Sequence, residues 1–148
     1  MTRNGPTLVL ILTIAAFTTG ALAQVEPTDP TVKARMELMK DIRAQMGTLG
    51  GMAQGKMAFD ADAAAEARRA LAEDASEIPA AFEQRATDPA TEAAPAIWED
   101  FADFTAKAKL LEDAATKLGT GSLDDLKAGI GEIGQACSGC HKLYRIEN

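Results

Sequence analysis

Apolar residues recur at spacings of three and four along most of the chain after residue 28, which is the periodicity of amphipathic helices. The first such stretch has Asp29 as N-cap and Pro30 at the first helical position. Its inward positions are Val32, Arg35, Met39, Ile42, Met46 and Leu49. Arg35 is the exception among them, and a charge on a buried face requires a partner. The following glycines predict a loop over roughly residues 50–60.

Two further helices are predicted in the middle of the chain. One runs from about Phe59 through Glu77, with a kink or break just before Pro79, because proline lacks an amide hydrogen and crowds the preceding turn. Residues 83–95 form the longest connection. Pro95 then opens the clearest amphipathic helix, whose inward positions are Ile97, Phe101, Phe104, Ala108, Leu111, Ala115 and Leu118.

A fourth helix is predicted after Gly119-Thr120-Gly121, with Ser122 and Asp125 resembling a capping box. Its inward positions are Leu126, Ile130, Ile133, Cys137, Cys140 and Tyr144. After residue 23 the chain has only two valines and no alternating apolar run, so nothing indicates a sheet. We therefore predict an all-α fold, an antiparallel four-helix bundle.

The first 23 residues have the pattern of a secretory signal. Arg3 supplies a positive start, residues 8–17 are apolar, and Ala21-Leu22-Ala23 is an A-x-A cleavage site. The alternative, an uncleaved membrane anchor, is disfavoured because about ten apolar residues are too few to span a bilayer. We expect cleavage after Ala23, export to the periplasm, and one domain over residues 24–148 without membrane insertion.

Charge narrows the choice of partners. Removing the signal lowers the number of Lys and Arg residues from 15 to 14 against 22 Asp and Glu, a formal net charge of −8. Such a surface argues against nucleic acid and favours a partner protein with a cationic or dipolar surface. The same charge would also serve solubility alone, and the sequence leaves monomer and homodimer both open.

Candidate chemistry lies in Cys137-Ser138-Gly139-Cys140-His141, which holds both cysteines and the only histidine. Cys-x-x-Cys-His is the attachment motif of haem c: two thiols bind the porphyrin and the imidazole ligates the iron. On a helix the three side chains share one face. Zinc would need further ligands, a thioredoxin-like redox pair would be expected near a βαβ unit, and a structural disulfide would leave His141 unexplained.

Three segments together resemble the class II c-type cytochromes, the cytochrome c prime family. They are the motif with its continuation to Arg145, residues Arg35 to Asp41, and Pro95 to Glu99. The similarity extends over essentially all of residues 24–148. The last two segments are most similar to the low-spin branch of the family, in which a methionine of the first helix is the sixth iron ligand. The resemblance therefore implies one covalently bound haem c, with His141 and Met39 on the iron and Arg35 near a haem propionate.

From the residues alone, a single histidine excludes bis-histidine ligation but leaves methionine, lysine or an open position. Met36 lies one turn from Met39 and is the alternative donor, and either methionine could simply fill the core. We expect a low-spin electron carrier that exchanges electrons with redox partner proteins and is not an enzyme, since no second histidine could act as general acid or base. The alternative is a high-spin, five-coordinate protein that binds nitric oxide or carbon monoxide.

Overall fold

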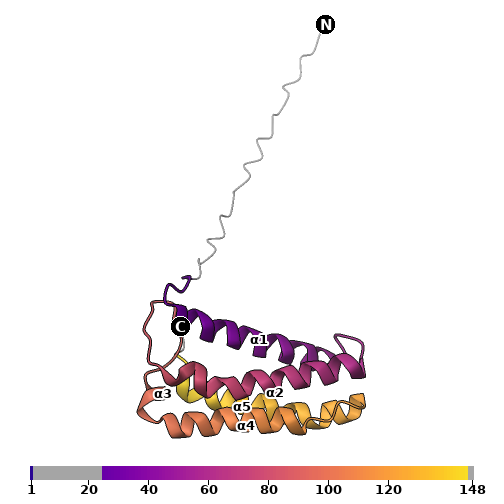
Figure 1. Ribbon diagram of the computed structural model, residues 1–148. Helices are drawn as coiled ribbons and strands as arrows, with labels where there is room; N and C mark the ends of the chain where they lie inside the picture. Colours follow the sequence, from indigo (N-terminus) through magenta and orange to yellow (C-terminus); the bar gives the residue numbers. More distant parts are fainter. Residues whose placement is uncertain (2–24, 147–148) are drawn as a thin grey trace.

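The computed structural model describes Met1 and residues 25–146, so the predicted signal over residues 1–23 and its cleavage site lie outside the described residues apart from Met1. The helices are α1 (Pro30–Ala53), α2 (Ala61–Glu83), α3 (Ala96–Glu99), α4 (Phe101–Lys117) and α5 (Leu123–Tyr144). The four long helices run alternately up and down and lie side by side (Figure 1). The predicted antiparallel bundle is confirmed, and α3 is a single extra turn before α4.

Each long helix begins at a side chain that accepts hydrogen bonds from the first turn. Asp29 accepts from the amides of Thr31 and Val32. Asp60 accepts from the amides of Asp62 and Ala63. Asp100 caps α4 and Ser122 caps α5 in the same way, each through the amide three residues on. Such caps satisfy amide groups that have no partner within the helix.

Three predicted boundaries differ from the structure. The glycines at the end of α1 lie inside the helix, which ends only at Ala53; the turn comes at Gly55, whose φ of 71° suits glycine. Of the kink or break predicted before Pro79, the break is wrong, because α2 continues to Glu83. A helix-interior proline costs about 3 kcal/mol, whereas burying the flanking Ile78 and Phe82 contributes roughly 1.5–3 kcal/mol each.

The third boundary concerns the helix predicted to open at Pro95. It is interrupted at Asp100, where φ is −136° and ψ is 69°, outside the helical region. The Asp100 side chain accepts a hydrogen bond from the Asp103 amide at 3.1 Å, so it ends α3 and caps α4 at once. The predicted inward positions of α4 itself, including Phe104, Ala108 and Leu111, are buried as expected.

One continuous core joins the four long helices. Aromatic rings from three of them meet near one end of the bundle: Phe104 lies 5.2 Å from Phe82 and 5.3 Å from Tyr144, centroid to centroid. Edge-to-face and tilted arrangements of this kind are favourable for aromatic pairs. Within residues 25–146 no helix is long and apolar enough to cross a membrane.

The connection between α2 and α3, residues 84–95, lies at the end of the bundle where α1 begins and α5 ends (Figure 1). The Asp88 carboxylate accepts bonds from the amides of Thr28, Asp29 and Ala90 at 2.8–2.9 Å. It also accepts one from the Thr28 hydroxyl at 2.9 Å. Asp88 therefore fastens the start of α1 to this connection.

Candidate functional site

The last three turns of α5 carry the cysteines and the histidine. Cys137 and Cys140 are free thiols, half-buried, and packed against the core. Burial raises the pKa of both thiols above their ordinary value. The motif was expected on the buried face of its helix; this is correct for the two cysteines, while His141 is exposed at the edge of that face.

His141 has the electrostatic surroundings of a neutral imidazole. Partial shielding from water lowers its pKa, the positive charge of Arg145 lowers it further, and the negative charge of Glu92 partly opposes both. Neutral imidazole is the form that can donate a lone pair to a metal. The carbonyl of His141 accepts a hydrogen bond from the Arg145 amide at 3.0 Å, which closes the last turn of α5.

Met39 and Met36 are one helical turn apart on α1, but their surroundings differ. Met39 is half-buried and packs against the same core as the two cysteines. Met36 lines a cleft of about 340 Å³ between α1, the residues before it and the 84–95 connection, together with Lys33 and Glu92 among others. Of the two methionines considered from the sequence, Met39 is therefore the one that packs against the core.

Arg35 is buried in the bundle, with only 3% of its surface exposed. Its Nε donates to the carbonyl of Ala81 at 2.8 Å and its Nη2 donates to the carbonyl of Gln84. The guanidinium also lies 4.9 Å from the Phe82 ring centroid and 5.3 Å from that of Trp98. Burial lowers the pKa of Arg35, and the charge of Asp29 partly restores it.

The remaining guanidinium nitrogen of Arg35, Nη1, is buried and has no hydrogen-bond partner among residues 25–146. A buried donor without an acceptor is costly, and a carboxylate is the acceptor that a guanidinium binds best. The two free, core-facing thiols, the adjacent imidazole and this unpaired donor form a set of groups that fits a haem with its propionates. Within the described residues, no cluster of three or more His, Cys, Asp or Glu could hold a metal ion instead.

Aromatic side chains surround this end of the site. Trp98 donates from Nε1 to the carbonyl of Phe82 at 2.8 Å, and Tyr144 is buried and donates from its hydroxyl to Asp103 at 2.6 Å. Tyr144 was expected at an inward position of its helix. Arg145 is exposed and forms an ion pair with Glu92.

Sequence reasoning missed the two carboxylates that organise this end, Asp88 and Glu92. Both lie in the predicted connection 83–95, which has no helical repeat of apolar residues. Without such a repeat, the sequence does not predict which residues these side chains contact. Asp88-Pro89 does have the composition of a turn start, and that is the one local signal that could have drawn attention to Asp88.

Comparison with known proteins agrees with these features. The family model described as Cytochrome C′ matches residues 30–145. Cytochrome c′ of Rubrivivax gelatinosus is 37% identical over 128 residues, covering 82% of this chain and 98% of that protein. Cytochrome c-556 of Agrobacterium tumefaciens, strain apple 185, is 38% identical over 122 residues, covering 79% and 95%.

Solved structures show the same similarity. The nitric oxide complex of a leucine-to-alanine variant of cytochrome c prime from Alcaligenes xylosoxidans superimposes with a TM-score of 0.71 and 29% identity, covering 80% of this chain and 94% of that one. These matches support the family as a whole. They do not support the narrower resemblance to its low-spin, methionine-ligated branch.

Proposed function

Because the chain belongs to the cytochrome c′ family, we propose that it is a periplasmic haem protein that binds nitric oxide or carbon monoxide and is not an enzyme. Haem c would be attached through Cys137 and Cys140, and His141 would supply an imidazole ligand to its iron. The bound haem provides the iron at which gas binding and one-electron change take place. The observation that carries the proposal is the pair of free, core-facing thiols beside an imidazole on α5.

The side chains that α1 contributes to the core favour a neutral gas as ligand. Met39, Ile42 and Met46 of its inward face are apolar and packed against the core. Apolar side chains at the haem would offer no hydrogen bond to an anion or to bound dioxygen, whereas carbon monoxide and nitric oxide need none. The nitric oxide complex of the related cytochrome c prime is consistent with this choice of ligand.

A second candidate function is electron transfer by a low-spin iron with His141 and Met39 as axial ligands. It is favoured by one observation, that Met39 is half-buried against the same core as Cys137 and Cys140. A thioether opposite an imidazole stabilises ferrous iron and raises the reduction potential. In that case Met39 would occupy the position that the gas would otherwise take.

Optical spectra separate the two candidates. The gas-binding protein should show high-spin ferric and ferrous spectra, and the ferrous form should bind carbon monoxide at once. A methionine-to-iron charge-transfer band in the ferric protein, and sharp low-spin bands on reduction, would instead support the electron carrier. Met39→Ala should leave a high-spin spectrum unchanged and should abolish a methionine-ligated one, and Met36→Ala is the matched control.

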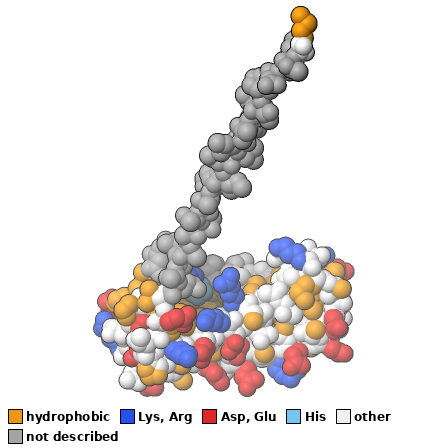
Figure 2. Space-filling view, turned by 90° about the horizontal axis from the view of Figure 1, so that it is seen from above, with side chains coloured by type: hydrophobic (Ala, Val, Ile, Leu, Met, Phe, Trp, Pro, Cys, Tyr) orange, Lys and Arg blue, Asp and Glu red, His pale blue; other side chains and the backbone are white. Residues whose placement is uncertain are grey.

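Partners follow from the surface charge. Acidic and basic side chains are interspersed over the face seen in Figure 2, with no continuous basic patch of the kind that binds nucleic acid. With 22 Asp and Glu against 15 Lys and Arg in the whole chain, redox partner proteins with a cationic docking surface are the partners we propose. Both a monomer and a homodimer are compatible with this assignment.

A further inference from the structure

An ion pair lies at the end of α5, close to the histidine of the attachment motif. Nε and Nη2 of Arg145 both lie 2.7 Å from Oε2 of Glu92. The backbone holds the two residues together, because the Ala94 amide donates to the Tyr144 carbonyl at 3.0 Å and the Ile146 amide to the Glu92 carbonyl at 2.8 Å. Residues 92–94 thus form a short antiparallel pair with residues 144–146, where Ala93 and Arg145 are bridged.

Both charges of this pair act on His141. Arg145 is one helical turn beyond His141, and its amide donates to the His141 carbonyl at 3.0 Å. The two side chains carry opposite charges, Arg145 positive and Glu92 negative, so their influences at the end of α5 have opposite signs. Lys142 is the other charged residue next to His141 in the chain, and it is exposed. The effect of Arg145 on the imidazole therefore depends on whether Glu92 neutralises it.

A charge next to an axial ligand changes the balance between ferric and ferrous iron. Reduction adds one electron to the iron and lowers the charge of the site by one, without breaking any bond of the chain. A positive charge nearby therefore favours the ferrous form, and a negative charge favours the ferric form. The Arg145 and Glu92 side chains are 52% and 42% exposed, so salt should screen their influence strongly.

We propose that Glu92 is a positioning residue that holds the Arg145 guanidinium one helical turn beyond His141 and neutralises its charge, so that losing either charge of the pair shifts the reduction potential of the haem iron. The inference rests on the proposed function only in that haem is attached with His141 as its ligand. The expected effect of the two charges on the reduction potential is the same whether the protein binds a gas or carries electrons. Sequence position alone would not suggest it, since the two residues are 53 positions apart.

The test is a potentiometric titration of the haem-loaded protein with dithionite, at low and at high salt. Glu92→Gln should raise the potential because it leaves Arg145 unneutralised, and Arg145→Gln should lower it because it leaves Glu92 alone. The double variant should return close to the wild-type value, and all shifts should shrink at high salt. Glu92→Asp keeps the charge and should restore most of the wild-type potential.

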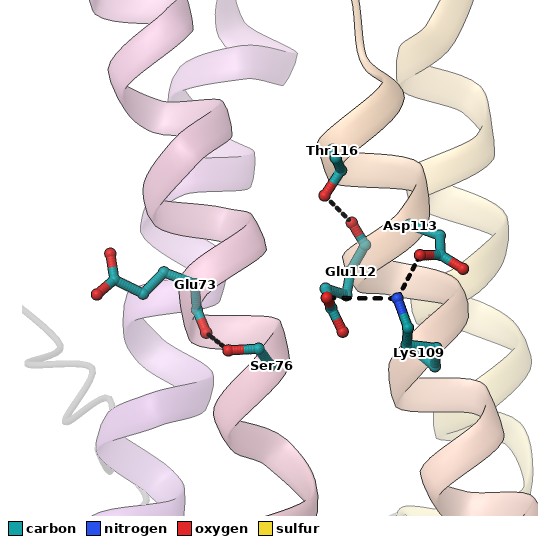
Figure 3. A network of polar contacts seen from close by, with 6 residues as sticks. All are labelled: Glu73, Ser76, Lys109, Glu112, Asp113 and Thr116. Carbon is teal, nitrogen blue, oxygen red and sulfur yellow. Dashed lines mark hydrogen bonds and ion pairs between the residues drawn. The ribbon is translucent and has the colours of Figure 1, made fainter.

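An ion pair remote from the motif provides the matched control. Lys109 pairs with Asp113 and, at 3.3 Å, with Glu112 on the exposed face of α4, with side-chain exposures similar to those of the first pair (Figure 3). Asp113→Asn should leave the potential unchanged. Shifts of the same sign in both single variants, or shifts that high salt does not reduce, would mean a purely structural role and overturn the inference. Failure of the ferrous protein to bind gas, with the opposite shifts intact, would overturn only the gas-binding function.

Discussion

Tyr144 at the end of α5 donates a hydrogen bond from its hydroxyl to Oδ2 of Asp103, at 2.6 Å, in the first turn of α4. The bond joins two residues of different helices that are 41 positions apart in the sequence. Tyr144 lies three residues after His141, the last residue of the haem attachment motif. It lowers the pKa of Asp103 and raises that of Tyr144 to about 12. The two shifts have one cause, because the bond exists only between the neutral phenol and the ionised carboxylate.

Tyr144 is the only tyrosine, so its titration can be followed by the ultraviolet absorbance of the phenolate. We expect a midpoint near pH 12 in the wild type and a lower one, closer to the ordinary value of 10, in Asp103→Asn. Because the folded pKa is raised, the stabilisation is fully present below pH 10 and is lost as the pH rises through about 12. An unchanged midpoint in the variant would show that Asp103 is not the partner in solution.

Replacing Arg35 tests whether its guanidinium supports the bundle through backbone carbonyls. Arg35→Ala should lower the free energy of unfolding by about 3 kcal/mol, because it leaves two buried carbonyls without donors and removes side-chain packing. Urea unfolding followed by circular dichroism would measure the difference. The loss should occur in the haem-free protein too, since the carbonyls of Ala81 and Gln84 belong to the chain itself.

Arg85→Ala is the control for this measurement. Arg85 is exposed, and its guanidinium also lies over the Trp98 ring, 5.6 Å from the ring centroid. Removing it should cost no more than about 0.5 kcal/mol, as for most surface substitutions. Equal losses in Arg85→Ala and Arg35→Ala would mean that contact with Trp98, rather than the bonds to the carbonyls, accounts for the effect.

Asp88 should make the protein sensitive to acid. Its pKa is lowered to about 2, first by the Ala90 amide and then by the amide of Asp29, with the Thr28 amide and hydroxyl adding to the effect. The stabilisation is therefore fully present above an ordinary pKa of 3.8 and disappears as the pH falls through about 2. Asp88→Asn should be less stable than the wild type at neutral pH, and that difference should narrow between pH 4 and pH 2.

Thr28→Ala is the matched comparison, because it removes only the hydroxyl among the donors to Asp88. Its effect on thermal unfolding should be smaller than that of Asp88→Asn and should follow the same pH dependence. A difference between Asp88→Asn and wild type that stays constant down to pH 2 would contradict the assignment.

Two glycines of α5 should respond oppositely to alanine. A Cβ at Gly131 would meet nothing within 4 Å, so Gly131→Ala should stabilise the helix by about 1 kcal/mol. A Cβ at Gly129 would lie 2.8 Å from Cδ1 of the buried Leu118, which must then move. Gly129→Ala should gain less or lose stability, as measured by thermal unfolding. An equal gain in both variants would show that Leu118 adapts freely.

Either thiol alone should be enough to hold the haem covalently. Cys137→Ser or Cys140→Ser leaves one covalent bond, and the haem of either variant should remain with the protein after acid-acetone extraction. The double variant should lose it completely. Ser138→Ala is the control, because the Ser138 hydroxyl only donates to the carbonyl of Gln135 within the same helix. Retention of haem by the double variant would mean that the cysteines are not the attachment points.

The fold could be predicted from the sequence where local chemistry decides it. Asp29 with Pro30, and Ser122, mark their helix starts correctly, and the inward positions of α4 are buried as the spacing predicts. Pro79 was misjudged because local propensity disfavours a helix there, whereas Ile78 and Phe82 are anchored by contacts from other helices. Contacts of this kind between helices cannot be predicted from the sequence of one helical segment.

The candidate site could likewise be predicted where it depends on neighbouring residues, and not where it depends on contacts between distant ones. The motif shows which residues hold the haem, because their spacing is local. The partners of Arg35 could not be predicted, since they are backbone carbonyls 46 and 49 residues away, and a carbonyl has no residue type by which to recognise it. Glu92 and Asp88 were missed for the related reason that a loop brings them to their partners.

The placement of Trp98 gives the protein an internal optical probe. It is the only tryptophan, and its indole is fixed by the bond from Nε1 to the Phe82 carbonyl and by two guanidinium groups over its ring. Its fluorescence therefore reports one location, the junction of α2, α3 and α1. Haem absorbs at the wavelengths that indole emits, so the emission should be quenched in the loaded protein and recover in the haem-free one. The chain thus allows cofactor loading and opening of this junction to be followed without any added label.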